Sequence, residues 1–246
     1  MVPRRMLGRR PGELGRPAIR DLEERSMSEN YLTEENLVEK AREWLSVSSR
    51  QESRRKRFEF NVNSAALLVL DMQNYFMDPE SHAHVPSGHA VLPNIRSLIG
   101  FFRSAGRPVI FTRHGLESGE DPGIMGRWWR DNVREDSSES AIIESLDVKD
   151  SDAVIRKTRY SAFVGTDLER MLKSKGVESL VIAGLTTHLC CDSTARDAFM
   201  KDFAVFFVVD ATATWTEDLH VSSLKALSDG FVIPVATNDI LNGSRD

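Results

Sequence analysis

The sequence predicts an α/β fold of three layers (αβα), with a doubly wound, mostly parallel six-stranded sheet between helices. From residue 65 onward, short apolar runs alternate with helical stretches, a pattern typical of parallel strands joined by crossover helices. The six runs are almost continuously apolar, as expected for strands buried on both faces. They lie at residues 65–71, 108–112, 153–157, 179–184, 204–209 and 231–236.

Helices are expected between these strands, and a single core should join all of them. The helical stretches lie at residues 91–105, 138–146, 164–175, 191–202 and 217–228. No internal repeat is visible. We therefore expect one domain over residues 58–246, preceded by an N-terminal extension over residues 1–57.

The extension begins with residues 1–26, which are rich in Arg, Gly and Pro and almost free of large apolar side chains. This composition predicts disorder. Two origins stay open: an upstream start assignment before Met27, or an Arg-rich targeting leader. The four acidic residues in this stretch favour the first, because transit peptides are poor in acids.

A helix is expected over residues 33–46. Thr33 can cap its N-terminus, and Leu37, Ala41, Trp44 and Leu45 fall on one helical face. That apolar face predicts packing on the main domain or on a second subunit.

Composition points to a small-molecule partner. The net charge of −5 gives no general field for nucleic acid or for an anionic membrane surface. No apolar run approaches the ~18–20 residues of a transmembrane helix. The two cysteines, Cys190 and Cys191, are neighbours and cannot form an ordinary disulfide framework, which predicts a reducing, cytoplasmic setting.

Three reactive side chains are expected at one edge of the sheet. Ligand sites in such sheets lie beyond the carboxyl ends of the strands. Asp71 ends the first strand, Lys157 ends the third, and Cys190 follows the fourth after a short turn. Each has an ordinary structural reading, as a turn former, an exposed amine or a buried small side chain. Their convergence favours catalysis.

The three residues form a hydrolytic set. Cys190 at the start of a helix would be stabilised as a thiolate by free N–H groups and the positive helix end, so it is the candidate nucleophile. Asp71 could accept the thiol proton and return it to a departing amine. Lys157 would keep the carboxylate ionised. The N–H groups of residues 186–190 could form an oxyanion hole.

Three motifs carry a family resemblance. The stretches "LLVLDMQNYF", "KTRYSAFVGTDLERML" and "GLTTHLCCDSTARDAF" resemble the isochorismatase-like, or cysteine hydrolase, superfamily over residues 58–241. The resemblance implies a Rossmann-like fold with Asp71 as general acid/base, Lys157 as the family's lysine and Cys190 as the nucleophile. No cofactor is implied, and family members are commonly assembled as homodimers or homotetramers.

The resemblance also implies details of the turn before the nucleophile. The family has a cis peptide there, which would join Leu185 and Thr186, and an oxyanion hole made by the amides of Thr186 and Cys190. Cys191 would be a packing residue.

The implied function is hydrolysis of a small amide or carbamoyl C–N bond through a thioester on Cys190, with release of ammonia or an amine. One alternative is vinyl ether hydrolysis of the isochorismatase type, although true isochorismatases generally carry glycine where Cys190 stands. A second alternative is a non-catalytic oligomeric binding protein.

No metal site is expected. Nicotinamidases of the superfamily hold a metal through an Asp-x-His pair and another His, whereas this chain has His114 without that Asp. His82, His84 and His89 could form another cluster, but no carboxylate at zinc-type spacing completes it. A polar loop over the site is the favoured interpretation of these histidines.

Substrate contacts are expected from residues around the strand ends. Trp128 and Trp129 could form an aromatic wall near the substrate or pack at a subunit interface, and the two alternatives stay open. The full set of predicted contact residues is Gln73, Phe76, Trp128, Trp129, Tyr160, Phe163 and His188.

Overall fold

The computed structural model describes residues 28–48, 58–129 and 132–243. Six strands form one sheet in the order β3-β2-β1-β4-β5-β6, and each pairing of neighbours is parallel. The strands are β1 (Ala65–Leu70), β2 (Val109–His114), β3 (Ala153–Lys157), β4 (Ser179–Leu185), β5 (Ala204–Ala213) and β6 (Ile233–Val235). The predicted doubly wound α/β fold is confirmed.

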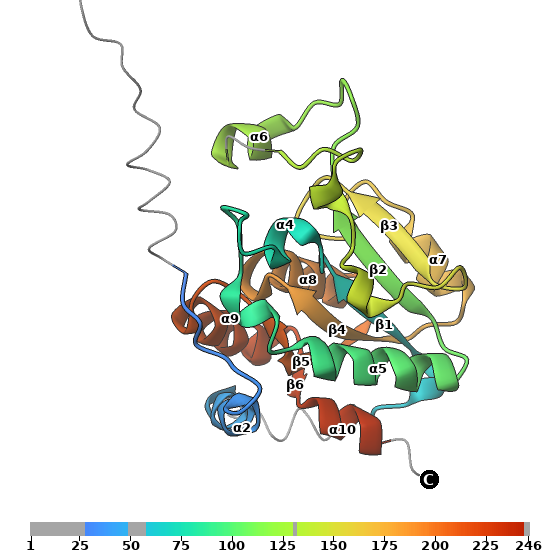
Figure 1. Ribbon diagram of the computed structural model, residues 1–246. Helices are drawn as coiled ribbons and strands as arrows, with labels where there is room; N and C mark the ends of the chain where they lie inside the picture. The colour runs from blue at the N-terminus through green and yellow to red at the C-terminus, as the bar shows by residue number, and fades with distance from the viewer. Residues whose placement is uncertain (1–27, 49–57, 130–131, 244–246) are drawn as a thin grey trace, which may run out of the picture.

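Helices cover both faces of the sheet. Helix α5 lies on one face, with α10 beside it, while α7, α8 and α9 lie on the other (Figure 1). This placement follows from right-handed crossovers, because the chain moves one way from β1 to β3 and the other way from β3 to β6. The helices of the domain are α4 (Asn74–Met77), α5 (Leu92–Ser104), α6 (Gly123–Trp129), α7 (Leu168–Ser174), α8 (Asp192–Met200), α9 (Glu217–Gly230) and α10 (Thr237–Asn242).

The helix predicted over residues 138–146 is wrong. Two 3₁₀ turns, Ser138–Ser140 and Glu144–Leu146, occupy this stretch. The Ser140 hydroxyl donates to the carbonyls of Glu135 and Ser137, and the Ser140 carbonyl accepts from Gln73. The two hydroxyl bonds are local and compete with a helical ladder, whereas Gln73 reaches the Ser140 carbonyl from a distant segment. The structure also contains the short helix α6, which is not among the predicted helical stretches.

The central strands are packed from both sides. Every residue of β1 and β4 is buried, which accounts for their unbroken apolar sequences. Gly184 in β4 has φ +114°, and a Cβ there would lie 2.1 Å from the carbonyl oxygen of Leu70. Only glycine fits this close approach between β4 and β1.

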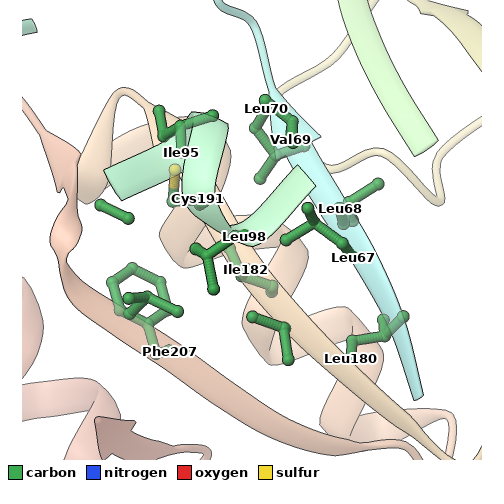
Figure 2. Packing of buried hydrophobic residues seen from close by; sticks show 14 of the residues in the cluster. Leu67, Leu68, Val69, Leu70, Ile95, Leu98, Leu180, Ile182, Cys191 and Phe207 are labelled. Atoms are coloured by element: carbon green, nitrogen blue, oxygen red, sulfur yellow. The ribbon is translucent and has the colours of Figure 1, made fainter. Parts of the chain in front are cut away.

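The core contains the second cysteine. Figure 2 shows Cys191 among labelled apolar side chains that include Ile95 and Leu98 of α5 and Ile182 of β4. Cys191 is fully buried in this cluster, so its predicted role in packing is confirmed.

The N-terminal helix α2 (Leu37–Ser48) begins later than predicted. Thr33 still accepts a hydrogen bond from the backbone N–H of Asn36, but residues 34–36 form a turn before the helix. Leu37, Ala41 and Trp44 are buried, and α2 packs on α9 and β5. The prediction of disorder for residues 1–26 lies outside the described residues, and the domain boundary at residue 58 stays a prediction.

No helix in the described part of the chain combines the length and the apolar character needed to cross a bilayer.

Candidate active site

The ends of three strands bring the predicted acid, amine and thiol together. Asp71 directly follows β1, Lys157 is the last residue of β3, and Cys190 lies in a π-helical turn (Thr187–Cys191) after β4. Lys157 Nζ is 2.7 Å from Asp71 Oδ2 and 3.4 Å from Cys190 Sγ. All three residues are buried. The convergence expected from the strand-end rule is therefore present.

Strand β2 holds the carboxylate from the other side. The Thr112 hydroxyl donates to Asp71 Oδ1 at 2.6 Å, and the backbone N–H of Asp71 donates to the same hydroxyl at 3.3 Å. Both oxygens of Asp71 thus face a donor, one from Thr112 and one from Lys157. This arrangement fixes the rotamer of the carboxylate.

Lys157 remains a cation in this site. Burial is the largest single influence and acts to lower its pKa, but the charges and hydrogen bonds of Asp71 and Cys190 together outweigh burial, and the pKa rises above its usual value. The ammonium also donates to the carbonyl oxygen of Arg159 at 3.1 Å.

Cys190 is a neutral thiol in the resting site, which differs from the expected thiolate. Burial raises its pKa to about 12, Asp71 adds to the increase, and Lys157 opposes it. The physical reason is its position: α8 begins only at Asp192, so Cys190 lies inside the π-helical turn and away from solvent. In the predicted role of Cys190 as nucleophile, a proton acceptor would be needed before the sulfur could attack.

The turn before Cys190 has the conformation that the family resemblance implies. The Leu185–Thr186 peptide is cis. The Thr186 carbonyl accepts hydrogen bonds from the N–H groups of Leu189 and Cys191, which closes the turn. The oxyanion role of the Thr186 and Cys190 amides stays a prediction.

An aromatic row connects several predicted contact residues. Trp129 Nε1 donates to the Tyr160 hydroxyl at 2.6 Å, and the Trp129 ring lies 6.1 Å from Trp215. The Trp215 ring in turn lies 5.4 Å from the ring of His188, which stands two positions before Cys190. Sequence reasoning missed Trp215, although it follows the carboxyl end of β5, where the strand-end rule would have placed it. Trp128 is 74% exposed and lies outside this row.

Three of the other predicted contact residues are used in the protein's own packing. Gln73 accepts from the His114 N–H and donates to the carbonyls of His114 and Ser140, so its amide joins β2 to the 3₁₀ turn. Phe76 and Phe163 are buried in the apolar core. Their contact with a substrate stays a prediction.

His114 is a second residue that sequence reasoning did not place in the site. Burial and the charge of Lys157 lower its pKa to about 4, so the imidazole is neutral. Its position at the end of β2, between Asp71 and Lys157 on the flanking strands, is the signal that could have identified it.

The loop histidines are engaged separately. His82 Nε2 lies 3.3 Å from the Tyr75 hydroxyl, His89 Nε2 lies 3.0 Å from the Met77 carbonyl oxygen, and the His84 and His89 rings are 6.1 Å apart. Among the residues that the structure describes, no group of three or more His, Cys, Asp or Glu could hold a metal ion. The absence of a metal stays a prediction.

Comparisons of the sequence and of the fold with known proteins identify a family. The family model for the isochorismatase domain matches residues 65–239. Nicotinamidase 3 of Arabidopsis thaliana is 40% identical over 189 residues, which cover 76% of this chain and 91% of that protein. Enterobactin synthase component B of Escherichia coli K12 is 34% identical over 74% of this chain and 64% of its own length. A cysteine hydrolase structure from Pseudomonas syringae pv. phaseolicola has a TM-score of 0.73 at 26% identity, over 76% of this chain and 95% of that chain. The chain therefore belongs to the isochorismatase family of hydrolases.

Proposed function

We propose that this hydrolase cleaves the C–N bond of a small amide or carbamoyl compound through a thioester on Cys190. The observation that carries the proposal is the buried contact of Cys190 Sγ with Lys157 Nζ at 3.4 Å, beside the 2.7 Å ion pair of Lys157 with Asp71. A nucleophilic sulfur next to an acid/base group is the arrangement required for acyl transfer. The 40% identity to nicotinamidase 3 supports an amide substrate.

In the proposed reaction, Asp71 accepts the Cys190 proton while the sulfur attacks the carbonyl carbon. The protonated Asp71 then donates to the departing nitrogen, the C–N bond breaks, and ammonia or an amine leaves. Water attacks the thioester, gives a proton to Asp71, and releases the acid product. Asp71 finally returns this proton to the sulfur.

Lys157 and two backbone amides would stabilise the negative charge that develops during attack. The Lys157 ammonium touches both Asp71 and Cys190 and keeps its proton throughout. In the proposed site, the N–H groups of Thr186 and Cys190 bind the carbonyl oxygen as it becomes an oxyanion.

A second candidate function is vinyl ether hydrolysis with release of pyruvate. It is favoured by 34% identity over 181 residues to the isochorismatase of Bacillus subtilis and by the similar match to enterobactin synthase component B. In that reaction Asp71 would act as the general acid and Cys190 would not be required. Membership in a hydrolase family favours catalysis over the non-catalytic alternative.

A matched pair of cysteine variants tests the proposal. Wild type, Cys190→Ala and Cys191→Ala should be supplied with a panel of small amides and with isochorismate, and ammonia and pyruvate should be measured. Ammonia release is expected from wild type and from Cys191→Ala, and none from Cys190→Ala. Pyruvate release that persists in Cys190→Ala, with no ammonia from any amide, would contradict the proposal and favour the vinyl ether reaction.

A further inference from the structure

The N-terminal segment, residues 28–48, lies outside the residues matched by the family model, yet it packs on α9 and β5, which both contact the turn that carries Cys190. In Figure 1 this segment, drawn in blue, passes α9 before it enters α2. It is firmly docked, since Leu32 and Trp44 are each only 1% exposed. The backbone N–H of Glu29 also donates to the Trp215 carbonyl at 2.7 Å.

One connection to the nucleophile turn runs through Tyr31. The Tyr31 hydroxyl accepts a hydrogen bond from the backbone N–H of Thr214 at 3.1 Å. The Thr214 hydroxyl lies 2.7 Å from His188 Nδ1, within hydrogen-bonding distance. His188 belongs to the π-helical turn and stands two positions before Cys190. Tyr31 thus fixes Thr214, whose hydroxyl contacts His188 in the turn.

A second connection runs through Trp44, whose ring lies 6.2 Å from that of Tyr31. The Trp44 ring lies 4.3 Å from the ring of His220, and its Nε1 donates to Glu217 at 3.0 Å. His220 Nδ1 is 2.9 Å from the Thr187 hydroxyl, and both residues are fully buried. Thr187 is the first residue of the π-helical turn. Trp44 covers the histidine that bonds to this residue.

Both connections end in the same five-residue turn. This turn supplies the nucleophilic sulfur and one of the two proposed oxyanion donors, so its position controls the attack geometry. A displacement of about 1 Å at such a site can lower a rate by about a hundredfold. Loss of the contacts made by the N-terminal segment should therefore lower kcat as well as the stability of the fold.

We propose that the N-terminal segment is a positioning element of the active site, which sets the turn Thr187–Cys191 through Tyr31–Thr214–His188 and through Trp44–His220–Thr187. The inference rests on the proposed function for its kinetic readout. Tyr31 and Trp44 act through other residues and touch neither Asp71, Lys157 nor Cys190 in the described hydrogen bonds.

The first test compares Tyr31→Phe with Ser87→Ala in the full chain. Tyr31→Phe removes the acceptor of the Thr214 N–H, whereas Ser87→Ala removes two other hydrogen bonds to the same segment, with Glu29 and Leu32. We expect similar small decreases in Tm. With the best amide substrate, kcat should fall about tenfold in Tyr31→Phe at nearly constant KM, because a small displacement of the turn slows attack. The kcat of Ser87→Ala should stay within about twofold of the wild-type kcat. Equal kcat values in the two variants would overturn the proposal.

The second test uses His220 and a rescue by a conservative side chain. The Asn side chain of His220→Asn can place a polar atom near the position of Nδ1 and keep the bond to Thr187, whereas His220→Leu cannot. For folded variants, kcat should be lowered in His220→Leu and largely retained in His220→Asn. Equal losses in both would overturn the connection through Thr187.

A readout that needs no substrate separates this inference from the proposed function. Alkylation of Cys190 by iodoacetamide at pH 9, located by peptide mass spectrometry, should be faster in Tyr31→Phe than in Ser87→Ala and wild type, because a loosened turn admits the reagent. Equal rates would overturn the inference. A wild type that releases no ammonia from any amide would instead contradict the proposed function, while the alkylation comparison would still test the segment.

Discussion

Replacing Lys157 with methionine should destabilise the protein strongly, because the change leaves Asp71 as a buried charge without its cation. The two side chains are both 0% exposed, and their charged atoms are 2.7 Å apart. Breaking such a buried pair typically costs about 3–5 kcal/mol. For a protein of this size, about 1 kcal/mol shifts Tm by about 2–4 °C, so Tm should fall by about 6–20 °C.

The assay is guanidinium unfolding at pH 7, followed by tryptophan fluorescence, on Lys157→Met and on the double variant Asp71→Asn/Lys157→Met. The double variant should recover most of the loss, since no charge is then left unpaired. Lys173→Met is the matched control: Lys173 pairs with Glu169 at 2.7 Å on the surface, where ion pairs contribute little. This expectation is refuted if Lys157→Met lowers the free energy of unfolding by no more than Lys173→Met does, or if the double variant is as unstable as Lys157→Met.

Three further measurements test the fold and the site. Gly184→Ala should lower the free energy of unfolding by about 3 kcal/mol or more, because φ is +114° and a Cβ would lie 2.1 Å from the carbonyl oxygen of Leu70. Gly100→Ala should be tolerated, because a Cβ there would meet nothing within 4 Å, and equal urea unfolding midpoints for the two variants would contradict this expectation. Burial lowers the pKa of His220 to about 3, so the free energy of unfolding should fall as pH drops from about 6.5 to 4. In His220→Asn the dependence of this free energy on pH should be shallower by up to about 1.4 kcal/mol per pH unit, and an unchanged dependence would disprove a neutral buried ring. Because burial raises the pKa of Cys190 to about 12, wild-type alkylation should be slow at pH 7 and should accelerate toward pH 10; rapid alkylation at pH 6 would indicate a resting thiolate.

The sequence was sufficient for the parts of the protein that are set by burial. Strands β1 and β4 are apolar on both faces because helices cover both, so their runs were readable, and Asp71 was located by its position after β1. The stretch 138–146 could not be read in this way. Its backbone groups bond to side chains from distant segments, such as Gln73, and no local pattern encodes such a partner.

His114, which sequence reasoning missed, belongs to the site only because of the residues on the neighbouring strands. His114 looked like the remnant of an incomplete metal motif, and only the order of the strands places it between Asp71 and Lys157. Its neutral state is likewise produced by burial and by the Lys157 charge, which the sequence does not display.

The protonation states are compatible with the proposed attack by Cys190 in a buried site. Asp71 and Lys157 form a neutral ion pair, Cys190 is a neutral thiol, and His114 is a neutral imidazole. When the Cys190 proton moves to Asp71 in the proposed reaction, the negative charge leaves the carboxylate and appears on the sulfur and then on the substrate oxygen. Lys157 lies within 3.4 Å of the sulfur and stays positive, so the buried site remains neutral overall. Because isolated charges are costly in a low-dielectric interior, this transfer between two partners of one cation would allow the proposed attack to occur away from water.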